Sequence, residues 1–296
     1  MEIRVLRYFL AVAREESITK AAEVLHITQP TLSRQLSQLE EELGVTLFYR
    51  GSRKISLTNE GILLRRRAEE ILQLMDKTEK ELAEQEEAVE GTVSIGCGDL
   101  HSVQLLPELF RTFHQKYPAV TFDLYPATAD HVREQMERGL IDVGLLLEPV
   151  NMERYEFIRL SQKEQWVVAM HPQSPLAQKD CITPADLKDL PLILPRRPNV
   201  QSEVASWFGD DFEHLHVLFT SNLPANSSIM VYYKLAYAII VQGSLSLADP
   251  KKIICRPLSP EMTTSSVLAW KRQQPFGIAA SKFIEHIKST LSDIEA

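Results

Sequence analysis

The stretch ITQPTLSRQLSQLEEELG, residues 27–44, joins an apolar stripe to a markedly polar opposite face. At helical spacing the stripe consists of Leu32, Leu36, Leu39 and Leu43, and this pattern predicts a helix that turns one face to a core. The other face offers amides, hydroxyls and one cation, Arg34, where an ordinary solvated helix carries more lysine and glutamate. Acidic side chains come only at residues 40–42, near the expected end of the helix.

The residues before this stretch predict two shorter helices. The first is amphipathic and ends near Glu15, and the second, TKAAEVLH, can begin at a cap provided by Ser17 or Thr19. Thr28 then caps the third helix, and Pro30 lies in its first turn, where the missing N–H costs nothing. Two short helices, a tight turn and a third helix with a polar face are typical of a helix-turn-helix.

Amides and hydroxyls on such a helix can read base edges and phosphates in a DNA major groove, where carboxylates would be repelled. After Gly44, VTLFYRGSRKISLT predicts two short strands around a turn with a basic tip, which would lie along a phosphate backbone. A solvated three-helix module is the alternative for any single element of this pattern. The candidate DNA contacts are Thr28, Gln29, Pro30, Thr31, Ser33, Arg34, Gln35, Gln38, Arg50, Arg53 and Lys54.

The segment SITKAAEVLHITQPTLSRQLSQLEEELGVTLFYRGSRKISLTNEG, residues 17–61, closely resembles the winged helix-turn-helix of LysR-type transcriptional regulators. The match follows AA-x2-L-x3-QP-x2-SRQ-x3-LE-x2-LG-x2-LF-x-R and then LT-x2-G. The resemblance implies that residues 29, 31, 33 and 34 face double-stranded DNA and that the basic wing supports them. Glu60 departs from the small residue usual before Gly61, but a carboxylate suits the start of a helix.

From Thr58 a helical pattern runs to about Glu90, with a seam whose positions alternate four and three residues apart. This heptad repeat predicts a coiled coil, although a helix packed on its own domain would also have an apolar stripe. The resemblance implies a linker helix that pairs subunits of a homodimer or homotetramer. The predicted dimerisation residues are Leu64, Ala68, Ile71, Met75 and Leu82.

From Gly91 onward, strand and helix patterns alternate, which predicts a parallel sheet with right-handed crossovers. Two α/β lobes joined by two crossings would form a cleft, as in periplasmic binding proteins. The expected fold class is α + α/β, with a winged helix-turn-helix (1–58), a linker helix (59–90) and a two-lobed effector domain (91–296). Lobe 1 would comprise about 91–161 plus 266–296, and lobe 2 about 162–265. The run LLP-x2-LF-x2-F-x3-YP also looks like the effector domain of the same family.

Ligands in open α/β sheets bind beyond the carboxyl ends of the strands. That rule points to GCGDLHS (96–102) and PATADH (126–131), with RRPNVQS (196–202) or SNLPANSS (221–228) facing them from the second lobe. For each residue, a structural role in a cap or loop is an equal alternative to ligand contact. An acid at position 99 would repel an anion or bind an amine. The candidate effector contacts are Asp99, His101, Ser102, Thr128, Asn199 and Asn222.

The family pattern fails at one place in the second lobe. Many members carry Gly-x-Gly before the strand that follows a second-lobe helix, whereas this chain reads Lys234-Leu235-Ala236-Tyr237. Because the glycines are missing, the family pattern does not predict the backbone conformation of this segment.

The 296-residue chain has 44% apolar residues, 24% charged residues and a net charge of −8. Residues 1–67 carry 11 lysines and arginines against 8 acids, and residues 68–91 carry 2 against 9, so DNA binding is expected only at the basic end. No signal peptide or membrane span is evident, which predicts a cytoplasmic protein. The three distant cysteines predict no disulfide framework.

Other classes of protein account for less of the chain. No G-x-S-x-G, HExxH, Walker or dinucleotide fingerprint marks an enzyme, and no cofactor is expected. His214 and His216 lack further metal ligands nearby, and Cys97 could be a redox sensor but has no evident partner cysteine. A solute-binding protein would not need residues 1–60, and a simple nucleoid protein would not need the large α/β part. We therefore expect a transcriptional regulator controlled by a small molecule between the lobes, which contacts DNA and has RNA polymerase as a further candidate partner.

Overall fold

The computed structural model describes residues 1–50, 55–83, 89–245 and 249–292. The chain forms two compact units, Met1–Ala83 and Glu84–Ala296. No helix of the described residues is long and apolar enough to cross a membrane.

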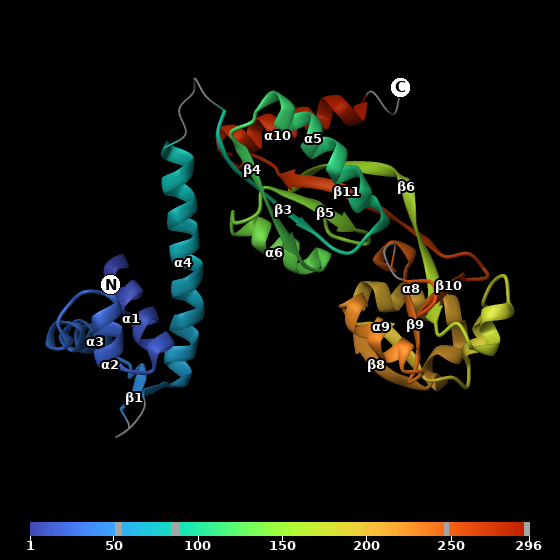
Figure 1. Cartoon of the computed structure of the whole chain (residues 1–296), viewed down its shortest axis with the longest axis horizontal. Coiled ribbons are helices and arrows are strands. Elements are labelled where there is room, and N and C mark those ends of the chain that lie inside the picture. Colours follow the sequence, from blue (N-terminus) through green and yellow to red (C-terminus); the bar gives the residue numbers. More distant parts are fainter. Residues whose placement is uncertain (51–54, 84–88, 246–248, 293–296) are drawn as a thin grey trace. The chain divides into compact units, whose positions relative to one another are not determined.

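The first unit contains three short helices, a long fourth helix that packs against the first of them, and a two-stranded hairpin (Figure 1). Its elements are α1 (Ile3–Glu15), α2 (Ile18–Val24), α3 (Gln29–Leu43), β1 (Phe48–Arg50), β2 (Ile55–Leu57) and α4 (Asn59–Ala83). Ser17 caps α2, because its side chain accepts a hydrogen bond from the Lys20 N–H at 3.4 Å. Gly44 ends α3 at φ 67°, in the left-handed region that favours glycine. The expected order of helices and wing strands is therefore present.

The core of the first unit contains the apolar face of α3. Leu32, Leu36 and Leu39 are at most 2% exposed, whereas Leu43 at the helix end is 40% exposed. They pack with Phe9 of α1 and with Leu47 just before β1. Three of the four leucines of the predicted stripe thus hold α3 in place.

Helix α4 differs from the predicted linker helix at both ends of its seam. Ala68 is fully buried and Leu64 packs on the core of the same unit, so these two residues contact their own chain. Helix α4 is described as far as Ala83, residues 84–88 lie outside the described residues, and Val89 packs on the core of the second unit. The heptad spacing marked the apolar face correctly but could not tell whether its partner was the same chain.

The second unit has two lobes built on one sheet with the strand order β4-β3-β5-β11-β6-β9-β7-β8, and β10 pairs with β6. Lobe 1 is defined here by its strands β3 (Gly91–Cys97), β4 (Val120–Pro126) and β5 (Val143–Leu147), and its helices η1 (His101–Leu105), α5 (Leu106–Lys116), α6 (Ala129–Glu137) and α10 (Ile278–Ser292). Strand β3 runs parallel to both β4 and β5, as the alternating pattern predicted. Helices α5 and α10 lie side by side on one face of this sheet, and α6 covers the other (Figure 1).

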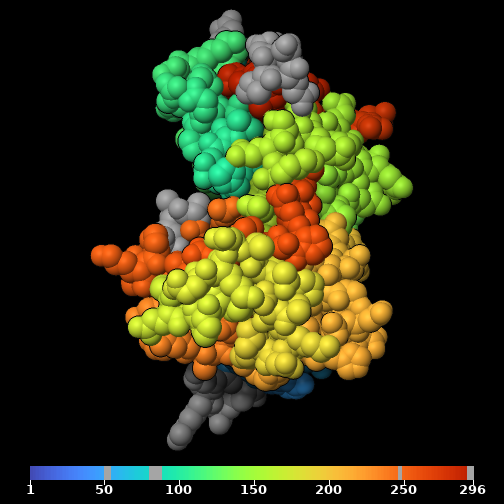
Figure 2. Space-filling view, turned by 90° about the vertical axis from the view of Figure 1, so that its right-hand side faces the viewer, coloured from blue at the N-terminus to red at the C-terminus, as the bar shows by residue number. Residues whose placement is uncertain are grey.

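Lobe 2 contains the remaining elements of the second unit except for the two crossing strands. These are η2 (Pro175–Gln178), α7 (Pro184–Leu187), β7 (Leu192–Pro195), α8 (Pro198–Phe208), η3 (Gly209–His214), β8 (Val217–Ser221), α9 (Pro224–Tyr232), β9 (Tyr237–Val241), η4 (Gln242–Leu245) and β10 (Ile254–Pro257). The crossing strands are β6 (Tyr155–Met170) and β11 (Thr263–Lys271), and they are antiparallel to each other. The surface narrows between the lobes where they pass (Figure 2).

Two helices of lobe 2 begin inside segments that the sequence analysis placed at the cleft. Helix α8 begins at Pro198, within RRPNVQS, and α9 begins at Pro224, within SNLPANSS. In both cases a proline occupies the first turn, the position that tolerates it best. Both segments are therefore partly the first turn of a helix, which determines where their side chains lie.

The segment that lacks the family glycines keeps a turn that glycine would favour. Lys234 adopts φ 60°, a left-handed conformation that costs a non-glycine residue about 1–2 kcal/mol. Its ammonium donates a hydrogen bond to Gln173 Oε1 at 2.7 Å. The segment thus forms a left-handed turn without glycine, and Lys234 takes the strained conformation.

We expect Gly243→Ala to destabilise the second unit strongly. A Cβ at this position would lie 1.8 Å from the backbone nitrogen of His101 and 2.5 Å from its Cα. Both are backbone atoms, so η1 or η4 must shift, at a cost of about 3 kcal/mol of unfolding free energy. Urea unfolding followed by tryptophan fluorescence measures this cost, because all three tryptophans lie in this unit.

The matched control is Gly98→Ala near the same cavity. Its Cβ would meet nothing nearer than the Ala127 carbonyl oxygen at 3.4 Å, so we expect a change within about 0.5 kcal/mol. Equal stability of the two variants would contradict the close approach of η4 to η1.

Candidate functional sites

The first candidate site is the exposed face of α3. Arg34 and Gln38 are exposed, Ser33 and Gln35 are half-buried, and the helix start is exposed at Thr28, Gln29, Pro30 and Thr31. The buried leucines on the opposite side prevent the helix from rotating. The predicted contact residues on α3 therefore share one accessible surface.

Several polar side chains on this face have no partner among the described residues, although Gln38 donates to Glu42 at 3.4 Å. The Thr28 and Thr31 hydroxyls pair with each other at 2.8 Å. Within the described ranges, no hydrogen bond or ion pair involves the side chains of Gln29, Arg34 or Gln35. Their donors and acceptors are free to meet base edges or phosphates.

The acidic end of α3 has a structural role. Glu40 Oε1 accepts hydrogen bonds from the backbone N–H groups of Leu47 and Phe48, at 2.7 and 3.3 Å. Glu42 lies 2.9 Å from the N-terminal ammonium of Met1, and this contact lowers the pKa of the Glu42 carboxyl. The acidic side chains at the end of α3 thus bind other parts of the same chain, whereas the amides before them face solvent.

The hairpin after α3 is antiparallel, with Phe48 opposite Leu57 and Arg50 opposite Ile55. Arg50 is the last residue of β1, so its backbone is placed at the hairpin end. The side chain of Arg50 and the whole of Arg53 and Lys54 lie outside the described residues.

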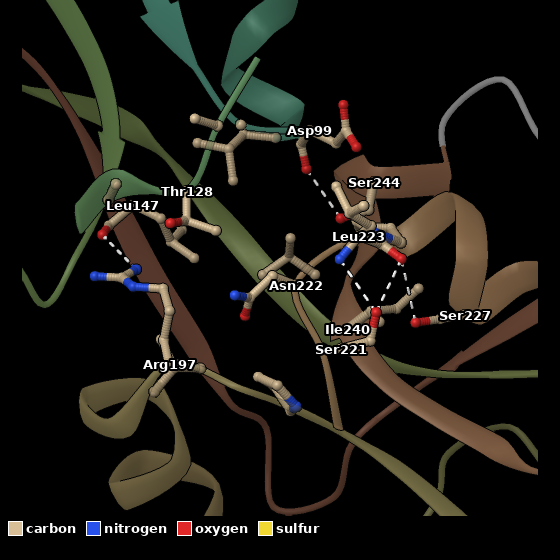
Figure 3. Close-up of a pocket in the computed structure, with 18 of the residues that line it drawn as sticks. Asp99, Thr128, Leu147, Arg197, Ser221, Asn222, Leu223, Ser227, Ile240 and Ser244 are labelled. Atoms are coloured by element: carbon tan, nitrogen blue, oxygen red, sulfur yellow. Dashed lines mark hydrogen bonds between the residues drawn. The ribbon is translucent and has the colours of Figure 1, made fainter. Parts of the chain in front are cut away.

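The second candidate site is a cavity of about 170 Å³ walled by both lobes (Figure 3). Its walls come from the ends of β3, β4 and β5, from β6, β7 and β9, and from the first turns of α6, α8 and α9. Most lining side chains are apolar, and they include Leu100, Leu145, Leu147, Trp166, Ile193, Leu194, Val200, Leu223, Ile239 and Val241. An apolar cavity of about 150 Å³ can hold a benzene molecule, so this one has room for a single-ring ligand.

The structure brings three of the six predicted effector residues to the cavity. Asp99, Thr128 and Asn222 line it, from the segment after β3, the start of α6 and the start of α9. His101 and Ser102 do not line it, and neither does Asn199. Helix α8 instead presents Val200 and its capping residue Arg197 to the cavity, because the helix begins at Pro198, inside the predicted segment.

His101 and Ser102 are held by a carboxylate from the crossing strand β6. The backbone N–H groups of both residues donate to Glu164, each at 2.9 Å, and the Ser266 hydroxyl donates to it at 3.2 Å. Glu164 is 1% exposed and Ser102 is 2% exposed. The sequence analysis expected these N–H groups to bind an anionic ligand. They bind the Glu164 carboxylate instead.

Arg197 is the one basic side chain among the described lining residues, and it links the lobes. Its Nε and Nη2 donate to the Asp130 carboxylate of α6, at 2.9 and 3.4 Å. The same guanidinium donates to the carbonyl oxygens of Leu147 and Pro149, at 3.3 and 3.0 Å. Figure 3 shows Arg197 reaching across to Leu147. Arg197 is nearly buried at the edge of the cavity, whereas Asp130 is partly exposed to solvent. The sequence analysis named the segment that contains Arg197 but not the residue.

Cys97 lines the same cavity, but its surroundings do not activate it. Burial, and secondly the charge of Asp99, raise the pKa of the Cys97 thiol. A reactive cysteine needs a lowered pKa, so this environment does not favour the redox alternative. No group of three or more metal-ligating side chains is found in the described part of the chain.

Comparison with known proteins matches both units to one family. The profile described as "Bacterial regulatory helix-turn-helix protein, lysR family" matches residues 3–62, and "LysR substrate binding domain" matches residues 86–292. An uncharacterised HTH-type transcriptional regulator of Bacillus subtilis, YvbU, is 32% identical over 97% of this chain and 98% of its own. BenM of Acinetobacter baylyi is 36% identical over 71% of this chain and 70% of its own length.

The solved structures agree with these matches over nearly the full length. The crystal structure of full-length CbnR complexed with its target DNA has a TM-score of 0.76 at 25% identity. The match covers 98% of this chain and 99% of CbnR. The crystal structure of full-length BenM has a TM-score of 0.52 at 28% identity, and the match covers 99% of this chain and 98% of that one.

We expect Asp130→Asn to destabilise the second unit through Arg197. The Arg197 side chain is 9% exposed, so loss of its carboxylate leaves a nearly buried charge with only carbonyl partners. Asp130 itself is 42% exposed, so we expect a loss of about 1–2 kcal/mol instead of the full cost of breaking a buried pair. Urea unfolding measures the change.

Glu134→Gln is the matched control on the same helix. It removes a carboxylate paired with Arg138 across one exposed helical turn, which is worth about 0.3–0.5 kcal/mol. If Asp130→Asn cost no more than this control, Arg197 would not depend on Asp130.

Proposed function

The chain belongs to the LysR family of bacterial transcriptional regulators, and from that premise we propose that a small molecule bound between lobes 1 and 2 controls its binding to DNA. It is a DNA-binding regulator with an effector-binding domain. The observation that carries the proposal is the cavity walled by both lobes, whose edge is crossed by the Arg197–Asp130 ion pair. A ligand there contacts both lobes at once.

The control would operate through the arrangement of the lobes. A ligand shifts an equilibrium only by its difference in affinity between two states. Because the walls come from both lobes, a ligand touches different atoms when the lobes are closer or further apart. We propose that this change alters how subunits are placed on DNA, and with it their contact with RNA polymerase.

For the DNA contact, we propose that α3 enters the major groove. The side chains of Gln29, Arg34 and Gln35, which have no partner within the described ranges, support this role. The wing residues Arg50, Arg53 and Lys54 would contact phosphates beside it. The relative CbnR has been solved with its target DNA, and the match to it covers 98% of this chain.

Fluorescence anisotropy with the DNA upstream of the chain's own gene tests this function. We expect binding that exceeds that of a scrambled fragment of equal length and weakens steeply with salt. Arg34→Ala should lose about 1–3 kcal/mol of specific binding, because a guanidinium that reads guanine is replaced by a methyl group. Equal affinity of wild type and variant for both fragments would contradict the proposed role of α3.

Arg66→Ala is the matched control. Arg66 is exposed on α4 and pairs with Glu70, so its loss removes a positive charge from the same unit without touching α3. We expect its specific binding to stay within a factor of about two of the wild type.

We also propose that the protein works as a homodimer or homotetramer joined partly through its second unit. The two outermost strands of the sheet, β4 and β8, both expose apolar side chains. Leu124 of β4 is 53% exposed, and Leu218 of β8 is 45% exposed. Apolar edge strands are unfavourable in water unless another surface covers them, and a second copy supplies such a surface. On α4, Ile71 and Met75 stay available for pairing, whereas Leu82 has no described side chain.

Sedimentation velocity over a concentration series tests this assembly. We expect Leu218→Lys to weaken self-association at least tenfold, because a charge would enter the covered edge. Phe157→Lys is the control, since Phe157 is 40% exposed on β6, away from both edge strands. A monomeric wild type, or equal effects of both substitutions, would contradict the proposed interface.

A further inference from the structure

We infer that the cavity between the lobes takes an uncharged ligand, of about single-ring size, that carries both a hydrogen-bond acceptor and a donor. The inference rests on the proposed function and specifies the chemistry of its ligand. It follows from which polar groups of the cavity are already occupied and which are not.

The groups that would bind an anion are occupied by carboxylates of the chain. Arg197 holds Asp130 and two backbone carbonyls, so an anionic ligand would have to displace these partners. The N–H groups of η1 hold Glu164. A ligand carboxylate would enter a largely apolar cavity with no free cation among its described lining residues and would lose its hydration without compensation.

The cavity offers little to a cation. Asp99 is the one acidic residue among the described lining residues, and it is exposed. Its carboxylate is turned away from Thr128 and Asn222, and its backbone carbonyl accepts from the Ser244 hydroxyl at 2.9 Å (Figure 3). An ammonium or amidinium group inside the cavity would therefore lack a nearby counter-charge.

The lining hydroxyls are also occupied. Ser221 donates to the Leu223 carbonyl at 3.1 Å, and Ser227 donates to the same oxygen at 3.4 Å. The Thr128 hydroxyl pairs with His131 Nδ1 at 2.9 Å. Each of these groups already has a partner within the chain, so a ligand gains less from them.

Two neutral groups on the wall stay without a partner. Trp166 is 2% exposed, and its Nε1 has no hydrogen-bond partner in the described part of the chain. The Asn222 amide makes no hydrogen bond or ion pair with described residues, and it lies in the middle of the drawn pocket (Figure 3). The Trp166 Nε1 atom is covered by its neighbours, so an acceptor on the ligand reaches it only when a neighbouring side chain shifts, and pairing then recovers the free-energy cost of a buried unpaired donor. The amide of Asn222 both donates and accepts, which fits a ligand with an acceptor and a donor.

Benzamide, benzoate and benzamidinium test this inference, because they share one ring and nearly one shape but differ in charge. Isothermal titration of the full chain at pH 7 measures each affinity. We expect benzamide to bind at least tenfold more tightly than either ion. Hexanamide, hexanoate and hexylammonium repeat the comparison without a ring.

Substitutions place the binding in the cavity. Asn222→Ala and Trp166→Phe should each weaken benzamide at least fivefold, whereas Asn226→Ala and Trp207→Phe should leave it unchanged, because neither control residue lines the cavity. Asn222 is exposed, so we expect Asn222→Ala to fold normally. It therefore tests ligand binding even if replacing the buried Trp166 disturbs folding. Asp130→Asn frees Arg197 and should raise the affinity for benzoate relative to benzamide, an effect that Glu134→Gln should lack.

The possible results separate this inference from the proposed function. If benzoate or benzamidinium bound as tightly as benzamide, with Asn222→Ala weakening the binding, the cavity would stay the effector site and the uncharged ligand would be wrong. The inference would also be overturned if neither Asn222→Ala nor Trp166→Phe changed the affinity for benzamide. If none of these compounds bound, the proposed effector site itself would be contradicted.

Discussion

The buried carboxylate of Glu164 is the contact on which the two-lobed unit depends. It lies on β6, one of the two strands that pass between the lobes, and it accepts hydrogen bonds from η1 and from Ser266 of β11. A carboxylate that is 1% exposed needs such donors, because an unpaired buried charge is very costly. The same contact fixes the backbone of His101, against which Gly243 packs without room for a side chain. Glu164 and its backbone partners thus hold η1 and η4 together next to the cavity, without lining it themselves.

Local chemistry made α3 and the first half of the second unit predictable. The leucine spacing, the proline in the first turn and Gly44 at the end all act within a few residues, so they specify α3 without knowledge of the fold. The alternation from Gly91 to Leu147 likewise predicted that β3, β4 and β5 are parallel, and the structure adds their order, β4-β3-β5. Glu40 shows the limit of this reasoning, because its backbone partners lie seven and eight residues further on and follow from the fold.

Most of the predicted site residues that the structure places elsewhere have partners distant in sequence. His101 and Ser102 stood at the expected end of a strand, but Glu164, more than 60 residues away, occupies their N–H groups. Leu64 and Ala68 followed a heptad seam, yet Leu64 packs on the core that α1 and α3 of the same chain form. An apolar stripe indicates that one face of a helix is buried, but it does not indicate whether the same chain or another chain buries it. Trp166 gave no signal in the sequence, because its significance lies in the missing partner of its indole N–H, as far as the described residues go.

The two candidate sites differ in the polar groups that they leave unpaired, and this difference bears on how a ligand could act. On α3 the free groups include a cation, which suits a polyanion such as DNA. In the cavity the cation is held by Asp130, and that ion pair joins α6 of lobe 1 to the start of α8 of lobe 2. An uncharged ligand leaves the pair intact and adds contacts to both lobes, so it favours the arrangement in which the lobes are joined. A ligand that competed for Arg197 would instead favour their separation, so the charge of the ligand decides which arrangement of the lobes it stabilises.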